Sequence, residues 1–328
     1  MSVDVKLARL EPAHKPPGRR TSLENSMYKF KDSRWLLLLL LPCILYYAFF
    51  VYAPMWGIIV SFKDYKPFLG FSGSKWVGFK HYMRFFTNPA SWQLLRNTLT
   101  LSVYELVFGF TGTIVFALIV NEILQLRIKK AFQTITYIPY FISTVIIVGM
   151  LRLFLNPTGG LIFDILQRFG FPAIDMFAYS KYFRMLYVTS GIWQNIGWGA
   201  VIFYAAFAGI SPELYESAVI DGANKLKRIV HITLPGILPI IIIRLILYIG
   251  SMLTIGFDKI FLMQTPTTIS VSEVIETYIF KYGIGGGEYG ASQFSYGAAM
   301  GMFNSVVNMI LLFSANFIAK KTTKNSLF

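Results

Sequence analysis

Several polar and aromatic side chains stand inside long apolar stretches of this sequence. Polar residues at such depth are costly in a membrane and usually face a bundle interior or a water-filled cavity. Amide groups both donate and accept hydrogen bonds, so they can replace those that a sugar hydroxyl loses on leaving water. Aromatic faces beside such amides favour sugar binding. The candidate pathway residues are Glu105, Trp193, Gln194, Asn195, Trp198, Asp258, Asn304 and Asn308.

Helix packing is the competing explanation for the same pattern. Gly297 and Gly301 precede Asn304 and Asn308 on one face of an expected helix. Small residues let helices approach closely, and buried amides often bond a neighbouring helix. The sequence leaves open whether this face lines a pathway or forms a helix contact.

Residue types for catalysis, metal binding and nucleotide binding lack the required spacing. The three histidines, His14, His81 and His231, are far apart, and the single cysteine, Cys43, lies within an apolar run. No Gly-x4-Gly-Lys-Ser/Thr string occurs, and the glycine cluster at 283–290 lacks the lysine that would hold phosphates. We predict no catalytic residue, no metal site and no cofactor bound by this chain.

Residues 211–235 form a polar segment with the features of a short exposed helix. Ser211 and Pro212 suit the N-cap and the first helical position. Leu214 contributes to an apolar side, and Gly222 permits a bend or the close approach of another backbone. An exposed helix with an apolar side predicts a docking surface for a protein partner.

Composition places these residues in an all-α membrane protein. The chain is 55% hydrophobic and 14% charged, whereas a soluble domain usually carries about 25% charged residues. Six apolar runs are long enough for the roughly 20 helical residues that cross a bilayer. The predicted spans are Trp35–Phe62, Asn97–Val120, Ala131–Leu155, Phe183–Gly209, Gly236–Met263 and Phe294–Ile318.

Basic residues orient these spans. The N-terminal tail, the loops after the second and fourth spans and the C-terminal end hold more lysine and arginine than the other loops, which favours the cytoplasm for both termini. The net charge of +14 suits an anionic membrane surface better than nucleic acid. We predict a mostly disordered cytoplasmic tail at 1–33, a transmembrane domain at 34–320 and a cytoplasmic tail at 321–328.

The first outer loop has an unusual charge balance. It carries one acid, Asp64, and six basic residues: Lys63, Lys66, Lys75, Lys80, Arg84 and Arg96. Attraction of an acidic substrate, of lipid headgroups or of a docking protein explains this excess equally well.

The segment 211–235 resembles the EAA loop in permease subunits of bacterial ATP-binding-cassette (ABC) importers. That family pattern is Glu-Ala-Ala, three residues, Gly, about nine residues and Ile-x-Leu-Pro. Ser217 replaces the first alanine, a change that conserves size. Residues 294–308 are similar to a subgroup that handles complex oligosaccharides and polyuronate fragments such as alginate oligosaccharides. The residues that carry the EAA resemblance are Glu216, Ser217, Ala218, Asp221, Gly222, Ala223, Leu234 and Pro235.

The resemblance implies a type I ABC importer permease with six transmembrane helices in the bacterial cytoplasmic membrane. Its implied partners are a second permease subunit in a heterodimer, two ABC ATPase subunits that bind ATP and Mg²⁺, a solute-binding protein, an oligosaccharide and membrane lipids. The loop with Glu216 and Gly222 would dock on one ATPase as a coupling helix. ATP binding and hydrolysis would then drive alternating access.

Two other classes of membrane protein also fit an apolar chain. An ion-coupled secondary transporter or channel is one alternative, but we find no internal repeat, and it leaves residues 211–235 unexplained. A membrane-embedded enzyme would need clustered acids, metal ligands or a nucleophile beside its base. The sequence has none of these groupings.

Overall fold

The structure of this chain is a computed structural model. The predicted tail at 1–33 and most of the glycine cluster lie outside the described residues, as does part of the predicted C-terminal tail. The residues that the structure describes are 34–170, 174–285, 293–323 and 326–327.

The chain divides into two compact units, residues 1–56 and residues 57–328. The described part of the first unit is helical throughout, and its side chains from Leu38 onward are exposed. Pro54 has no N–H to donate to the preceding turn, and π-helical and 3-10 turns replace the α-helix around it. The elements here are α2 (Arg34–Tyr46), η1 (Tyr47–Tyr52) and η2 (Ala53–Phe62), the last running into the second unit.

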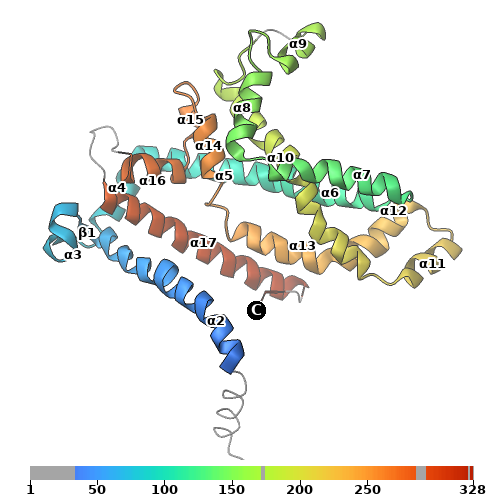
Figure 1. Ribbon diagram of the computed structural model, residues 1–328, viewed down its shortest axis with the longest axis horizontal. Coiled ribbons are helices and arrows are strands. Elements are labelled where there is room, and N and C mark those ends of the chain that lie inside the picture. Colours follow the sequence, from blue (N-terminus) through green and yellow to red (C-terminus); the bar gives the residue numbers. More distant parts are fainter. Residues whose placement is uncertain (1–33, 171–173, 286–292, 324–325, 328) are drawn as a thin grey trace, which may run out of the picture. The chain divides into compact units, whose positions relative to one another are not determined.

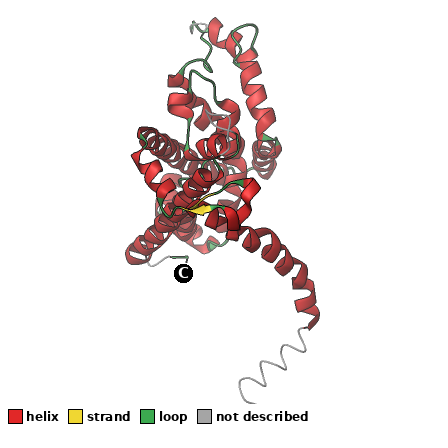
Figure 2. Ribbon diagram, turned by 90° about the vertical axis from the view of Figure 1, so that its left-hand side faces the viewer, coloured by secondary structure: helices red, strands yellow, loops and turns green. Residues whose placement is uncertain are grey.

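The second unit is mostly helical, with one antiparallel pair of two-residue strands (Figure 2). These are β1 (Lys63–Asp64) and β2 (Lys75–Trp76). The predicted all-α class is therefore correct for most of the chain and wrong for this hairpin.

The remaining elements (Figure 1) are η3 (Pro67–Leu69), α3 (Gly70–Gly73), α4 (Lys80–Thr87), α5 (Pro89–Tyr104), η4 (Glu105–Phe110), α6 (Thr111–Asn121), α7 (Leu126–Tyr137), η5 (Ile138–Phe141), α8 (Thr144–Phe154), α9 (Leu161–Arg168), α10 (Ser180–Ala208), α11 (Pro212–Ile220), α12 (Lys225–Arg228), η6 (Ile229–Thr233), α13 (Leu234–Ile249), α14 (Phe257–Met263), α15 (Ile269–Ser272), α16 (Ile275–Gly283) and α17 (Phe294–Thr323).

Four helical runs in the described part of the chain are long and apolar enough to cross a membrane, and a bent pair is a fifth candidate. At the predicted fourth span, α10 has 29 residues, which is about 44 Å at 1.5 Å per residue. It is not among the candidates because its polar residues lower its hydropathy. The four runs are Leu38–Phe62, Pro89–Asn121, Lys225–Ile249 and Phe294–Thr323, and the pair is Leu126–Phe141 with Thr144–Phe154.

The predicted third span, Ala131–Leu155, is not straight. It bends by 99° between η5 and α8. Pro139 lies in the last turn before the bend, where its missing N–H weakens the helical ladder. After the break, the Ser143 hydroxyl accepts a hydrogen bond from the Ile146 N–H at 3.4 Å and caps α8.

The predicted fifth span, Gly236–Met263, is also interrupted. The helix α13 ends at Ile249, and residues 250–256 form turns and irregular backbone. Gly256 has a φ of 30°, in the left-handed region that suits glycine, and it directly precedes α14. Asp258 therefore lies on a separate short helix and not at the end of one continuous span.

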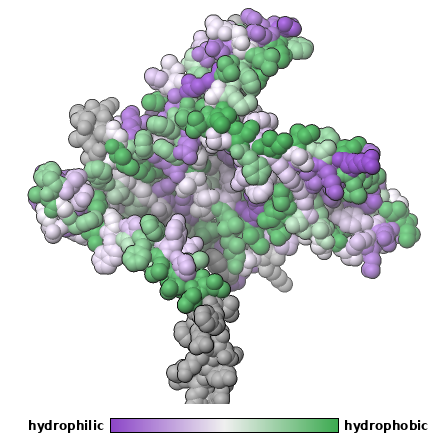
Figure 3. All heavy atoms as spheres, in the orientation of Figure 1, coloured by the Kyte–Doolittle hydropathy of each residue, from purple (hydrophilic) through white to green (hydrophobic). Residues whose placement is uncertain are grey.

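Three clusters of buried apolar side chains hold the second unit together. The first packs α10 against α8 and α14, the second packs α16 and α17 against α4, and the third packs α6, α10 and α13 together. Many large apolar side chains outside these clusters are exposed, and Figure 3 shows apolar surface spread over the visible face. In a bilayer such surface is available to lipid or to another subunit.

Candidate functional site

The helix α11 ends in a glycine-dependent cap. Gly222 adopts a left-handed conformation with a φ of 73°. Its N–H donates to the Val219 carbonyl at 3.0 Å, and the next N–H, that of Ala223, donates to the Ala218 carbonyl at 2.8 Å. These two bonds make a Schellman motif, in which the left-handed residue is usually glycine. The fold thus explains why glycine occupies this position of the predicted coupling loop.

The tip of α11 presents apolar side chains to solvent. Leu214, Val219 and Ile220 are exposed, the last by 86%. Glu216 is exposed beside them, and Ser217 donates its hydroxyl proton to the Leu214 carbonyl at 3.2 Å, so the serine is accommodated within its own helix turn. A cluster of exposed large apolar residues on a short helix suits contact with another protein.

Contacts inside the loop join α11 to the start of the next long helix. The Tyr215 hydroxyl lies 3.0 Å from the Thr233 hydroxyl at the end of η6. Leu234 and Pro235 begin α13 directly afterwards, where proline fits the first turn. A Cβ on Gly236 would lie 2.7 Å from the Ile210 side chain that precedes α11. Both ends of the loop are therefore packed together.

A polar pocket lies among η4, the start of α8, α10 and residues 248–259. Its volume is about 330 Å³, within the range of small-ligand sites. Four of the eight predicted pathway residues line it: Glu105, Gln194, Asn195 and Asp258. Residues from three separate stretches of the sequence thus meet at one cavity.

Breaks in regular helix help to position Glu105 and Gln194. Glu105 begins the π-helical segment η4, and π-bulges often occur at functional sites. Gln194 donates from Nε2 to the Ile142 carbonyl at 3.3 Å, at the bend before α8. Asn195 donates from Nδ2 to the Gly191 carbonyl of its own helix at 3.0 Å, which leaves its amide oxygen for another donor.

Lys259 is a pocket residue that sequence reasoning did not select. It is 8% exposed, and its Nζ donates to the Tyr187 carbonyl at 2.9 Å and lies 4.9 Å from the centre of the Tyr187 ring. A Cβ on Gly191 would lie 3.2 Å from this Nζ and 3.8 Å from Glu105 Oε1, so glycine leaves room for both charges. The available signal was a lysine directly after the predicted Asp258 in an otherwise apolar stretch.

The predicted tryptophans do not line this pocket. Trp198 stacks on Tyr140 with ring centres 4.8 Å apart, and Trp193 lines a separate, mostly apolar pocket with Ile147 and Phe154. Both therefore pack against the segments on either side of the bend between η5 and α8.

The asparagines of α17 also lie outside the pocket. Asn308 accepts a hydrogen bond from the Leu253 N–H at 3.0 Å and donates to the Thr254 hydroxyl at 2.9 Å. It thus fixes the irregular segment that contributes Thr254 to the pocket. Asn304 is buried on the same helix, and a Cβ on Gly297 would lie 2.8 Å from the backbone of α16. These contacts fit helix packing better than pore lining.

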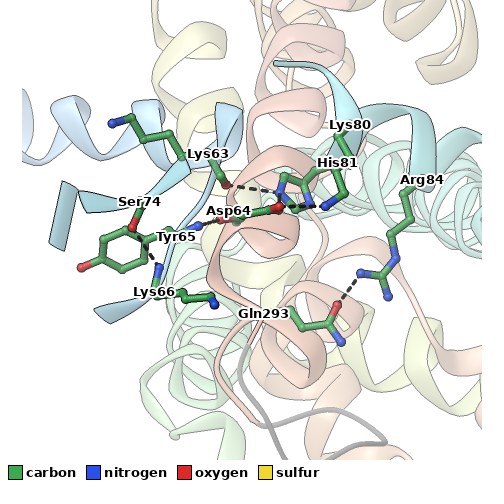
Figure 4. A network of polar contacts seen from close by, with 10 residues as sticks. Lys63, Asp64, Tyr65, Lys66, Ser74, Lys80, His81, Arg84 and Gln293 are labelled. Carbon is green, nitrogen blue, oxygen red and sulfur yellow. Dashed lines mark hydrogen bonds and ion pairs between the residues drawn. The ribbon is translucent and has the colours of Figure 1, made fainter. Parts of the chain in front are cut away.

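A second polar network lies where β1, α4 and the start of α17 meet (Figure 4). The Asp64 carboxylate lies 2.7 Å from Lys80 Nζ and 3.0 Å from His81 Nε2. The hydrogen bond from Lys80 holds the pKa of Asp64 below its usual value. Burial lowers the pKa of His81, against the opposing charge of Asp64. Within the described residues, no group of three His, Cys, Asp or Glu side chains is arranged to hold a metal ion.

Comparison with known proteins assigns most of the chain to one group. Residues 109–324 match the family described as binding-protein-dependent transport system inner membrane component. Protein LplB of Bacillus subtilis is 42% identical over 302 residues, covering 92% of this chain and 93% of that protein. The polygalacturonan/rhamnogalacturonan transport system permease protein YteP of the same species is 40% identical over 310 residues, covering 94% and 95%.

A solved structure agrees with these sequence matches. A chain in the crystal structure of a bacterial alginate ABC transporter, in complex with an alginate pentasaccharide-bound periplasmic protein, superposes with a TM-score of 0.83. It is 35% identical, and the match covers 92% of this chain and 99% of that chain.

Proposed function

The chain belongs to the binding-protein-dependent transport system inner membrane components, and on that premise we propose that it carries oligosaccharides through the membrane together with a second permease subunit. As a member of this family it is the permease component of an ABC importer and not the ATPase. In the proposed assembly it crosses the membrane six times with both termini in the cytoplasm. Two ATPase subunits bind ATP and Mg²⁺, and a solute-binding protein delivers the sugar from outside.

The observation that carries this proposal is the capped, apolar-tipped helix α11. Its exposed Leu214 and Ile220 give an ATPase a surface to bind, and the Gly222 cap fixes the end of that surface. The Tyr215–Thr233 contact then relates the position of α11 to the start of α13. Movement of an ATPase is thereby passed to a membrane helix, as a two-state transporter requires.

The polar pocket supplies the proposed sugar pathway. Glu105 and Asn195 offer acceptors, whereas Gln194 and Lys259 offer donors, so the pocket can exchange hydrogen bonds with several hydroxyl groups. The irregular segment 250–256 forms one wall and follows directly after α13. A shift of α13 therefore changes the shape of the pocket, which is the basis we propose for alternating access.

The proposed cargo is an oligosaccharide with uronic acid units. Support comes from the polygalacturonan/rhamnogalacturonan permease and the alginate transporter, both of which align with more than nine-tenths of this chain. The first outer loop adds an excess of basic side chains.

Reconstitution tests the proposal. The chain, its partner permease and the ATPases are placed in liposomes with the solute-binding protein, and uptake of a labelled oligogalacturonate is measured with and without ATP. We expect uptake only with ATP and the binding protein. Uptake that follows an ion gradient without ATP would show that an ion-coupled transporter was the better interpretation.

A further inference from the structure

A second pocket, which we call the outer pocket, lies between the β1–β2 hairpin, α4 and the start of α17. Its volume is about 340 Å³, within the range of small-ligand sites. Three cationic side chains line it, together with aromatic residues from the hairpin and α17: Lys66, Lys80, Arg84, Tyr65 and Phe294. The proposed topology places it outside the cytoplasm.

Among the residues that the structure describes, Asp64 is the one acidic residue lining the outer pocket, and it is already paired. Asp64 binds both Lys80 and His81 (Figure 4), so Lys80 and Asp64 largely neutralise each other. Lys66 and Arg84 then remain as net positive charges at the rim. Among the described residues, neither Lys66 nor Arg84 forms an ion pair. The hydrogen bond of Arg84 is to a neutral side chain.

Arg84 is held in place before any ligand arrives. Its Nη1 donates to the Gln293 Oε1 at 2.7 Å (Figure 4), and its guanidinium lies 4.5 Å from the centre of the Tyr296 ring. A guanidinium has five N–H donors in a planar fork that matches a carboxylate. The contact with Gln293 leaves several of these donors for a ligand.

The backbone beside Lys66 is also fixed. The Lys66 N–H donates to the Ser74 hydroxyl at 3.1 Å, and the Tyr65 N–H donates to the Ser295 hydroxyl at 2.8 Å. The second bond joins the hairpin to the first turn of α17, a 30-residue helix. The N-terminal end of such a helix adds partial positive charge to that of Lys66 and Arg84.

We propose that the outer pocket binds the carboxylate of a uronic acid unit in the transported oligosaccharide, with Arg84 and Lys66 as its cationic contacts. This inference rests on the proposed function and adds a binding site for the acidic groups of the proposed cargo. The half-buried Tyr65 and the exposed Phe294 offer ring faces beside the cations, a combination that fits an acidic sugar. An acidic protein surface is the competing occupant, and a concave pocket of this size favours the sugar.

The test uses the purified transporter, with its partner permease and ATPases, in nanodiscs without the solute-binding protein. The probes are a labelled tetragalacturonate and its carboxyl-reduced neutral counterpart. We expect the wild type to prefer the acidic probe. Lys66→Gln and Arg84→Gln should each weaken acidic binding about two- to fivefold, because the site is open to solvent, and together about tenfold. Binding of the neutral probe should not change.

Lys75→Gln is the matched control, since Lys75 is an exposed lysine of the same hairpin that does not line the outer pocket. It should leave acidic binding unchanged. No described side chain contacts the Lys66 ammonium through a hydrogen bond or ion pair. Lys66→Gln should therefore fold normally, so the site can still be tested if the Arg84 variant misfolds.

Three results would overturn the inference. Unchanged acidic binding in the double variant would remove both residues from sugar recognition. Equal wild-type affinity for the acidic and neutral probes would reject the acidic substrate class, while ATP-driven uptake of the neutral sugar would still uphold the importer. Weaker attachment of the solute-binding protein in the variants, without any direct sugar binding, would make the outer pocket a protein-docking surface.

Discussion

Replacing Gly222 tests the coupling loop most directly. A side chain in the left-handed region costs about 1–2 kcal/mol for most L residues, and a β-branched residue is least suited to it. A Cβ on Gly222 would meet nothing within 4 Å in this chain, so the cost in the isolated subunit comes from backbone conformation alone. A penalty of that size reduces the population of the capped loop about 5- to 30-fold relative to alternative conformations.

Glycine can be required at position 222 for its left-handed backbone conformation or for close approach of the ATPase. Gly222→Val and Gly222→Asn separate these two reasons. Asparagine tolerates the left-handed region, so the asparagine variant should keep most of the coupling if backbone conformation is what matters. The valine variant should insert into the membrane but bind the ATPase weakly and lose oligosaccharide-stimulated ATP hydrolysis. Gly112→Ala is the control, because Gly112 is a helical glycine whose added Cβ also meets nothing within 4 Å.

The measurements are the amount of ATPase that co-purifies, the stimulation of ATP hydrolysis by loaded binding protein, and uptake into liposomes. Normal coupling in Gly222→Val would refute the role of the cap. If Gly222→Asn fails as badly as Gly222→Val, the backbone argument is wrong, and close approach of the ATPase becomes the reason for glycine.

Three other measurements test separate parts of the structure. A cysteine at Asn224, in a Cys43→Ala background, should react with an impermeant maleimide only from the cytoplasmic side; labelling from outside intact cells would reverse the proposed topology. Asn308→Ala should lower the free energy of unfolding by about 1–3 kcal/mol, because a buried backbone N–H loses its acceptor, and Asn308→Asp should restore part of it; an unchanged melting temperature would contradict this role. Asp64 has a lowered pKa in the folded chain, so its contribution to stability is present above the usual value of 3.8 and is lost as the pH falls through the lowered value. The wild type should therefore melt above Asp64→Asn at pH 7 and together with it at strongly acidic pH, and a difference that grows on acidification would show that the sign is wrong.

The helical structure of the proposed coupling loop was predictable from sequence because its determinants are local. Pro212 and Pro235 each restrict one backbone position, whereas Gly222 permits a left-handed one, and their spacing fixes where helices begin and end. The structure begins α11 at Pro212 and ends it two residues before Gly222. Nothing from distant parts of the chain is needed to form this unit.

The polar pocket was only half predictable. Polar residues within apolar runs identified Glu105, Gln194 and Asn195, which all line it. The same rule also selected Asn304 and Asn308, because depth in a span does not tell which neighbour a side chain meets. Those neighbours depend on helix packing that the sequence pattern leaves undetermined.

The breaks in the third and fifth predicted spans were missed for a physical reason. Apolarity averaged over about 20 residues does not register a local change of backbone direction. Pro139, Gly250 and Gly256 were visible in the sequence, and each lies at or beside a break. Single residues of this kind are also tolerated within straight spans, so they did not decide the matter.

The break after α13 matters because it joins the two candidate sites. The helical run from Lys225 to Ile249 has 25 residues, which span about 37 Å at 1.5 Å per residue. Tyr215 of α11 contacts Thr233, the ninth residue of this run. The C-terminal end of the run leads into residues 250–256 of the pocket wall. Asn308 attaches that wall to α17. A continuous helix through Met263 would carry a displacement of α13 past the pocket. In the proposed mechanism, the irregular segment anchored on α17 changes shape when α13 moves. Loss of the Asn308 side chain should therefore disturb the pocket without touching the proposed ATPase-binding surface of α11.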